Sequence, residues 1–169
     1  LPCFGFSVAS TTLVAQSIGA DMRQLTKKYI RVSSILAVAI MFAAGLLMFI
    51  FSRPLMSIFT GDAEVIKLGA FVLRIEAFAE PAYALASVLS GAFRGMGDAR
   101  RPFLYSAVGM WCVRIVLSYV LVLVFHMGLT GVWIGMMLDW NARGLLCLNR
   151  MRRVRAELNR PAAYGADLP

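Results

Sequence analysis

The stretch VSSILAVAIMFAAGLLMFIFS, residues 32–52, decides the fold of this chain. It contains no charged residue, and it is closed by Arg31 on one side and by Arg53 and Pro54 on the other. About 20 apolar residues are the length that a helix needs to cross a bilayer. A helix in the core of a soluble protein is not apolar on all sides over such a length. The stretch therefore predicts a transmembrane helix.

The composition of the whole chain favours a membrane protein. Of its 169 residues, 60% are hydrophobic and 15% charged, with a mean hydropathy of +0.74. In a soluble domain, about half of the residues are hydrophobic and about a quarter are charged. The net charge of +8 would suit a nucleic-acid partner in a soluble protein. Here the basic residues cluster between long uncharged runs, which is typical of membrane orientation, so no nucleic-acid partner is expected.

The runs between charge clusters predict five membrane spans. They cover residues 3–20, 32–52, 68–93, 103–125 and 129–149. Each run is close to the spanning length of a helix. The predicted fold class is therefore all-α, a polytopic membrane helical bundle of about five transmembrane helices.

Lysine and arginine are distributed unevenly among the connections. Stretches 21–31, 94–101 and 150–160 carry four, three and five of them, whereas 53–67 carries two and 126–131 none. Cytoplasmic connections hold an excess of these residues. We therefore expect the three richer stretches, including the C-terminal end, to lie in the cytoplasm.

Ionisable residues inside the predicted spans indicate where a function should be sought. A charge near the bilayer centre costs about 2.5–3.5 kcal/mol on insertion scales, and it usually faces a bundle interior or a cavity. The span midpoints place Glu80, Arg114 and Asp139 at nearly the same depth. Three helices would then present ionisable groups at one level.

Glu76 and Glu80 stand four residues apart, on one face of their helix. Repulsion and desolvation favour the protonated form of at least one of them, which could then carry a proton. The alternative is structural, because Arg114 could pair with Glu80 or Asp139. Asp139 could also pair with Arg143, one turn away on its own helix. The residues alone leave both interpretations open.

Two further polar features lie within the spans. Pro81 follows Glu80, and a proline inside a helix frees a carbonyl one turn back, which can coordinate a cation or simply permit a bend. Gln16 is the only amide among the small residues of the first span, where it could line a cavity or merely accompany close helix packing. No HExxH, GxSxG or paired-metal spacing is present, so neither an enzyme nor a bound metal is expected.

Four stretches, taken together in their order and spacing, point to a family. They are residues 5–20 (GFSVASTTLVAQSIGA), 55–65 (LMSIFTGDAEV), 91–100 (GAFRGMGDAR), and 111–114 (WCVR) with 128–133 (GLTGVW). In this arrangement the chain resembles the C-terminal lobe of the multidrug and toxic compound extrusion (MATE) transporters. The resemblance covers essentially the whole chain.

The resemblance implies a fold of twelve helices, in two six-helix lobes around a cleft that opens alternately to either side. The five spans would be the last five helices. Residues 1–160 would form a partial C-terminal transmembrane lobe, and residues 161–169 a cytoplasmic tail. The expected partners are then the lipid bilayer and the N-terminal lobe of the same protein.

Members of this family expel cationic or aromatic drugs and metabolites in exchange for Na⁺ or H⁺. The resemblance therefore implies an antiporter, in a bacterial inner membrane, with no cofactor besides the coupling ion. In some relatives the third span carries an acidic residue at the position of Tyr83, and here the nearest carboxyl is Glu80, about one turn earlier. We expect Glu80 and Glu76 to exchange the ion, with Asp139 a poorer candidate and Arg114 tuning or locking them.

Tyr83 and Gln16 are the residues expected to contact substrate, because an aromatic face and an amide suit a flat cation. Two alternatives stay open. One is an exporter of lipid-linked sugars with a related fold, for which a broader basic cavity is expected. The other is a truncated membrane module that packs against partners without transporting.

Overall fold

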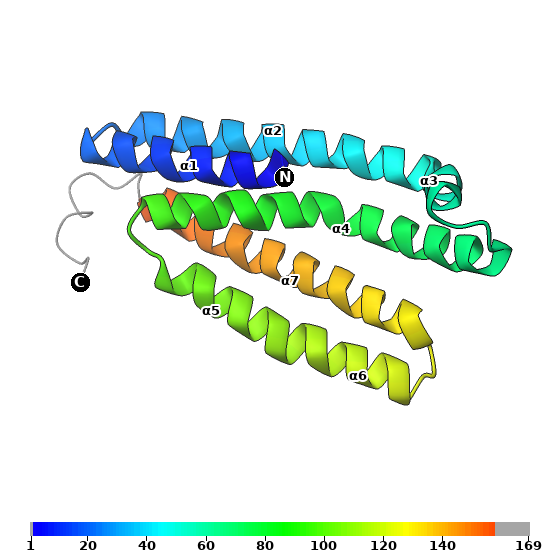
Figure 1. Ribbon diagram of the computed structural model, residues 1–169. Helices are drawn as coiled ribbons and strands as arrows, with labels where there is room; N and C mark the ends of the chain where they lie inside the picture. The colour runs from blue at the N-terminus through cyan, green and yellow to red at the C-terminus, as the bar shows by residue number, and fades with distance from the viewer. Residues whose placement is uncertain (1, 158–169) are drawn as a thin grey trace.

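The computed structural model describes residues 2–157, all of whose regular elements are helices (Figure 1). In chain order these are α1 (Pro2–Gly19), α2 (Arg23–Ile50), α3 (Ser52–Phe59), α4 (Ala63–Gly95), α5 (Arg100–Val108), the π-helical segment η1 (Gly109–Ile115), α6 (Val116–Leu123) and α7 (Gly128–Glu157). α5, η1 and α6 follow one another directly and form one rod (Figure 1). The all-α prediction is confirmed, and five rods coincide with the five predicted spans. The short helix α3 was not predicted, and the predicted tail 161–169 lies outside the described residues.

Local sequence explains where α4 begins and ends. The side chain of Asp62 accepts hydrogen bonds from the amides of Glu64 and Val65, which caps the N-terminus of the helix. Just past the C-terminus, Gly97 adopts a φ of +84°, which a residue with a side chain rarely adopts. Between these signals α4 runs for 33 residues, longer than any other helix described here.

α4 occupies the centre of the bundle, where it contacts α1, α2, α3 and α7 (Figure 1). The α5–α6 rod packs on α7. The larger buried cluster lies along the C-terminal half of α4, and it comprises Val14, Ile30, Leu89, Ala92, Phe93, Met96, Cys147, Met151 and Val154. This core holds four of the rods together and positions the polar residues of α4.

Large apolar side chains cover the outer faces of the bundle. Phe42 on α2 is 60% exposed and Trp111 on η1 is 66% exposed, and many neighbours are similar. Apolar exposure of this extent is unfavourable in water and suits a lipid environment. Among the described helices, α2 and the rod Arg100–Leu123 are long and apolar enough to cross a membrane by length and composition alone. α4 and α7 carry most of the ionisable residues that the sequence places inside the spans, and Arg114 lies on η1 within the rod.

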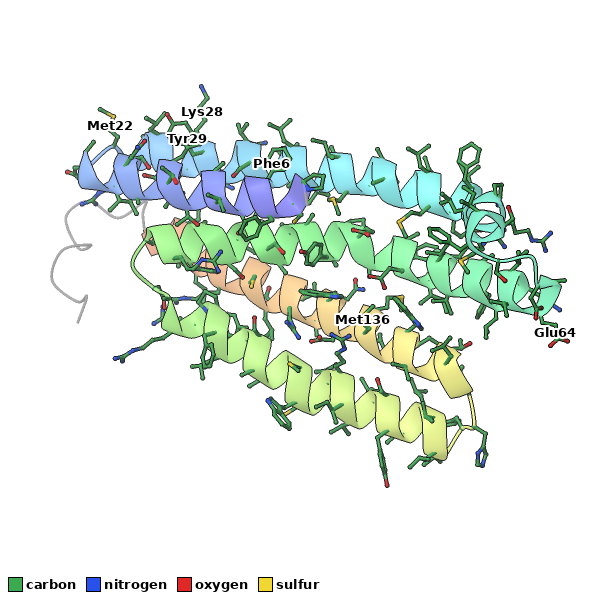
Figure 2. The ribbon with its side chains drawn as sticks, viewed as in Figure 1. Phe6, Met22, Lys28, Tyr29, Glu64 and Met136 are labelled. Carbon is green, nitrogen blue, oxygen red and sulfur yellow. The ribbon has the colours of Figure 1, made fainter. Side chains whose placement is uncertain are left out.

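Basic residues gather at one end of the bundle. The turn between α1 and α2, the turn between α4 and α5, and the C-terminal end of α7 all lie there (Figure 1). Figure 2 shows Lys28 at this end and Glu64 at the opposite one. The helix order therefore brings together the stretches whose lysine and arginine content is high, and the side of the membrane that they face stays a prediction.

A glycine allows α1 and α4 to approach closely. A β-carbon on Gly91 would lie within 2.8 Å of Ser7 Oγ, and closer still to the Ser7 carbonyl oxygen. Two hydrogen bonds cross the same contact, from Ser7 Oγ to the Ser87 carbonyl at 2.8 Å and from Thr11 Oγ1 to the Gly91 carbonyl at 3.0 Å. Small residues and hydroxyl groups are the usual means of helix association in membranes.

This contact predicts a loss of stability for Gly91→Ala. The added methyl group must push α1 away, and overpacking of this kind costs about 1–3 kcal/mol. The measurement is thermal unfolding of the purified complete gene product in detergent. Gly5→Ala is the matched control, because a β-carbon there meets nothing within 4 Å. Equal stability of the two variants would contradict the packing described here.

Candidate functional site

Glu76 and Glu80 lie partly buried on α4, near the middle of the bundle. Glu76 Oε2 is enclosed by the protein and has no hydrogen-bond partner among the described residues. Neither carboxyl takes part in an ion pair within residues 2–157, where the salt bridges are Arg23–Asp21, Arg101–Asp98 and Arg143–Asp139. A buried polar group without a partner is costly and uncommon. Glu76 is therefore available to a ligand that residues 2–157 do not supply.

Pro81 places a backbone oxygen beside these carboxyls. Proline has no N–H, so the Ala77 carbonyl lacks its usual donor one turn ahead. That oxygen lies against Gly45 of α2, where a β-carbon would come within 2.8 Å of it and within 3.5 Å of Glu80 Cβ. The Ala77 carbonyl oxygen and the base of the Glu80 side chain consequently both lie beside Gly45 of α2. Oxygen ligands of this kind suit a hard cation.

Arg114 occupies the last turn of η1, across from Glu76. Its guanidinium donates to Met136 Sδ at 2.9 Å, and the pairings with Glu80 or Asp139 considered from the sequence are not formed. Arg114 and Glu80 both act electrostatically on the Glu76 carboxyl. Arg114 thus lies in a π-helical segment, whose turns are wider than those of an α-helix.

Asp139 is locked by its neighbour. Arg143 Nε donates to Asp139 Oδ1 at 2.7 Å, and a second guanidinium nitrogen donates to the other carboxylate oxygen. The Asp139 side chain is fully buried, and only 11% of the Arg143 side chain is exposed. Gly109 faces the pair so closely that a β-carbon would collide with it. The pairing of Asp139 with Arg143 that the sequence suggested is therefore present, and whether it is purely structural stays a prediction.

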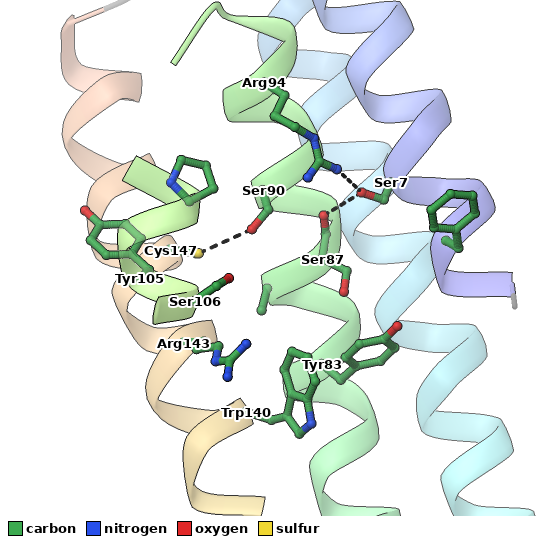
Figure 3. Close-up of a pocket in the computed structure, with 13 residues that line it drawn as sticks. Ser7, Tyr83, Ser87, Ser90, Arg94, Tyr105, Ser106, Trp140, Arg143 and Cys147 are labelled. Carbon is green, nitrogen blue, oxygen red and sulfur yellow. Dashed lines mark hydrogen bonds between the residues drawn. The ribbon is translucent and has the colours of Figure 1, made fainter. Parts of the chain in front are cut away.

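Tyr83 stands beside the same pair. Its ring packs edge to face against the Trp140 ring, with 4.6 Å between the two ring centres. The Arg143 guanidinium lies 4.7 Å from the centre of the Trp140 ring. Tyr83, Trp140 and Arg143 all line a cavity between α1, α4, α5 and α7 (Figure 3). Gln16 lies elsewhere, because its side chain is exposed on α1 and does not line this cavity.

Sequence reasoning missed two contributors to the site. Pro81 indicated a freed carbonyl, but no sequence pattern indicated that Gly45 of another helix would lie against it. Trp140 was not singled out, although its spacing from Arg143 is compatible with contact on one helix face. Of the predicted site residues, the structure brings Glu76, Glu80 and Arg114 into one region and leaves Gln16 outside it.

The fold and the site define a class of protein, namely a helical membrane bundle with ionisable groups in its interior. Comparison with known proteins gives the family. The family model described as MatE matches residues 1–120. Over 148 residues the chain is 34% identical to the "Probable multidrug resistance protein NorM" of Thermotoga maritima, covering 88% of this chain and 32% of that protein. The chain belongs to the MatE family.

Other relatives agree with this assignment. The "Uncharacterized transporter YisQ" of Bacillus subtilis is 29% identical over 151 residues, which cover 88% of this chain and 33% of that one. The chain therefore spans about a third of the length of these curated relatives. Membership of the family makes the chain part of an integral membrane protein.

Solved structures show the same fold. An inward-facing multidrug resistance MATE family transporter superimposes with a TM-score of 0.86 at 18% identity, over 96% of this chain and 38% of that one. A MOP superfamily transporter from Pyrococcus furiosus gives 0.84 at 19% identity, over 94% and 36%. The helix arrangement described above is thus that of known transporters.

The locked pair yields a prediction for Arg143→Gln. This change leaves the Asp139 carboxylate buried without its cation, so it should lower the free energy of unfolding by about 3–5 kcal/mol. The double variant Asp139→Asn, Arg143→Gln should recover much of that loss because no unpaired charge is left. Both are measured by denaturant titration of the complete gene product in detergent.

The exposed pair between Asp98 and Arg101 supplies the control for this experiment. Arg101→Gln should lower the free energy of unfolding by no more than about 1 kcal/mol, because water screens exposed ion pairs. A double variant of Asp139 and Arg143 no more stable than Arg143→Gln alone would contradict the described lock.

Proposed function

We propose that this chain forms part of a cation-coupled antiporter that exports cationic or aromatic drugs and metabolites by alternating access. Glu76 and Glu80 are the carboxyls that exchange H⁺ or Na⁺ for substrate. The observation that carries the proposal is the enclosed Glu76 Oε2, which has no partner within residues 2–157. Membership of the MatE family and the names of the relatives support it.

The chemistry of exchange follows from competition for one negative charge. A carboxylate that binds a small cation or a proton cannot at the same time neutralise a positively charged drug. If the occupant also favours one packing of the helices over another, its release drives the change of access. Glu76 and Glu80 suit this role because neither is tied up in an ion pair among the described residues, whereas Asp139 is.

Arg114 tunes this exchange in the proposal. Its charge acts on Glu76 across the bundle without a direct bond. A nearby guanidinium that is not bonded to the carboxylate stabilises its negative charge after one cation has left and before the next one binds. The η1 segment that carries Arg114 is a π-helix, a feature often found at functional sites.

Aromatic rings would select the flat part of a substrate. Tyr83 and Trp140 lie one beside the other, and the Arg143 guanidinium already lies at the Trp140 ring, which leaves the Tyr83 ring for the substrate. The Gln16 amide is exposed on α1, so it can form a hydrogen bond to a substrate. A substrate bound there would need a second protein surface on its other side to be enclosed. We propose that the N-terminal lobe of the same protein supplies that surface.

The proposed setting is a bacterial inner membrane with the C-terminus in the cytoplasm. The gathering of basic residues at one end of the bundle supports this orientation (Figure 1). The bundle exposes its apolar residues to lipid, and no nucleic acid takes part. If organic cations compete with the dye for efflux, the protein is a drug exporter and not an exporter of lipid-linked sugars. Absence of any efflux by the complete gene product would indicate a non-transporting module.

The proposal predicts that Glu80→Gln and Glu76→Gln reduce efflux of an ethidium-like dye at equal expression. Each amide keeps the shape of the side chain but removes the exchangeable charge, so the dependence of efflux on pH or Na⁺ should weaken by about tenfold or more, as is usual for loss of a charged contact. Efflux is measured by dye fluorescence in cells that express the complete gene product.

Glu64→Gln is the matched control for these variants. Glu64 lies on the same helix, in its exposed first turn, so its amide should leave efflux unchanged (Figure 2). Unaltered transport in both Glu76→Gln and Glu80→Gln would remove these carboxyls from the mechanism.

A further inference from the structure

A second polar site lies farther along α4 than the carboxyls. It is a cavity of about 280 Å³ between α1, α4, α5 and α7, and Figure 3 shows the side chains that line it. Its volume is near the lower end of the range for small-molecule pockets, about 300–1,000 Å³. The cavity therefore suits a compact ligand of roughly one ring and one polar group.

The charge of this cavity is opposite to that of the carboxyl region. Arg94 and Arg143 line it, and no Asp or Glu is among its lining residues. The charge of Arg143 is neutralised by its ion pair with Asp139, whereas Arg94 has no acidic partner among residues 2–157. The wall therefore carries one positive charge that the described residues leave uncompensated.

Both guanidinium groups keep hydrogen-bond donors for a ligand. Arginine has five N–H donors. Arg143 uses Nε and one terminal nitrogen on Asp139, and Arg94 uses one terminal nitrogen on Ser7 Oγ at 3.1 Å. Planar guanidinium groups of this kind bind carboxylate and phosphate oxygens in pairs.

Hydroxyl groups complete the lining and hold Arg94 in place. Ser7 Oγ accepts from Arg94 and donates to the Ser87 carbonyl, so α1 and α4 together fix the guanidinium at the wall (Figure 3). Ser90 and Ser106 face the same space, and neither is charged. The edge-to-face rings of Tyr83 and Trp140 form an apolar end, against which a ligand ring can lie.

We propose that this cavity binds an organic anion, with its carboxylate or phosphate group held by Arg94 and Arg143 and its apolar part against Trp140. The site is separate from the Glu76 and Glu80 carboxyls. α4 rises by about 1.5 Å per residue, so Arg94 stands about 20 Å from Glu80 along the helix. Binding at the cavity stands whether or not those carboxyls couple transport.

The first test is calorimetric titration of the complete gene product, purified in uncharged detergent, with phenyl phosphate. Benzylammonium, which has the same ring and the opposite charge, is the matched ligand. Phenyl phosphate should bind, more weakly as salt is raised, and an excess of benzylammonium should not displace it. Absence of phenyl phosphate binding, or displacement of phenyl phosphate by benzylammonium, would overturn the proposal.

Variants then assign the binding to the cavity. Arg94→Gln should weaken phenyl phosphate binding by about tenfold or more, because it removes a charge-assisted contact. Arg94→Lys should lose less, because the charge is kept. Arg100→Gln is the control, as Arg100 is exposed at the same end but does not line the cavity. An unchanged affinity in folded Arg94→Gln, or an equal loss in Arg100→Gln, would contradict the assignment.

A final arm identifies the source of the anion. The titration is repeated in nanodiscs of phosphatidylcholine alone and of phosphatidylcholine with phosphatidylglycerol. Loss of phenyl phosphate binding only with phosphatidylglycerol would identify a lipid headgroup as the occupant. Equal binding in both would identify a soluble anion, and either result supports an anion site.

Discussion

The central feature of the structure is a buried carboxyl group to which the described residues offer no hydrogen-bond partner. Glu76 Oε2 lies inside the helix bundle with no partner among the described residues, and its neighbour Glu80 forms no ion pair with them. Such an arrangement is costly in an apolar environment. It persists because α4 is fixed by packing against five other helices, so the helix cannot rotate the carboxyl outwards without breaking those contacts.

α4 therefore carries two polar regions of opposite character. Its middle holds free carboxyls and the carbonyl released by Pro81, which together suit a cation. Its C-terminal half holds Arg94 and the hydroxyl-lined cavity, which suits an anion. The Asp139–Arg143 pair lies within α7, against Gly109 of η1. In the proposed function the paired acid is structural, and the unpaired acids exchange the ion.

The sequence predicted the parts of the fold that composition controls. The uncharged run 32–52 and its counterparts marked all five rods, and the spacing of Glu76 and Glu80 placed both on one face of α4. Features set by contacts between helices were not accessible. The π-helical segment Gly109–Ile115 was not predicted, nor was the short helix α3, which follows the uncharged run. Likewise, only the structure shows that Gly45 receives the Ala77 carbonyl.

The most direct test of the central claim is chemical labelling of the buried acids. Dicyclohexylcarbodiimide reacts with protonated carboxyls in apolar surroundings, and mass spectrometry of the complete gene product locates the modified residues. The account predicts that Glu76 is modified, that ethidium protects it, and that the paired Asp139 stays unmodified. Modification of Glu76 that ethidium does not change, or modification of Asp139 in its place, would contradict it.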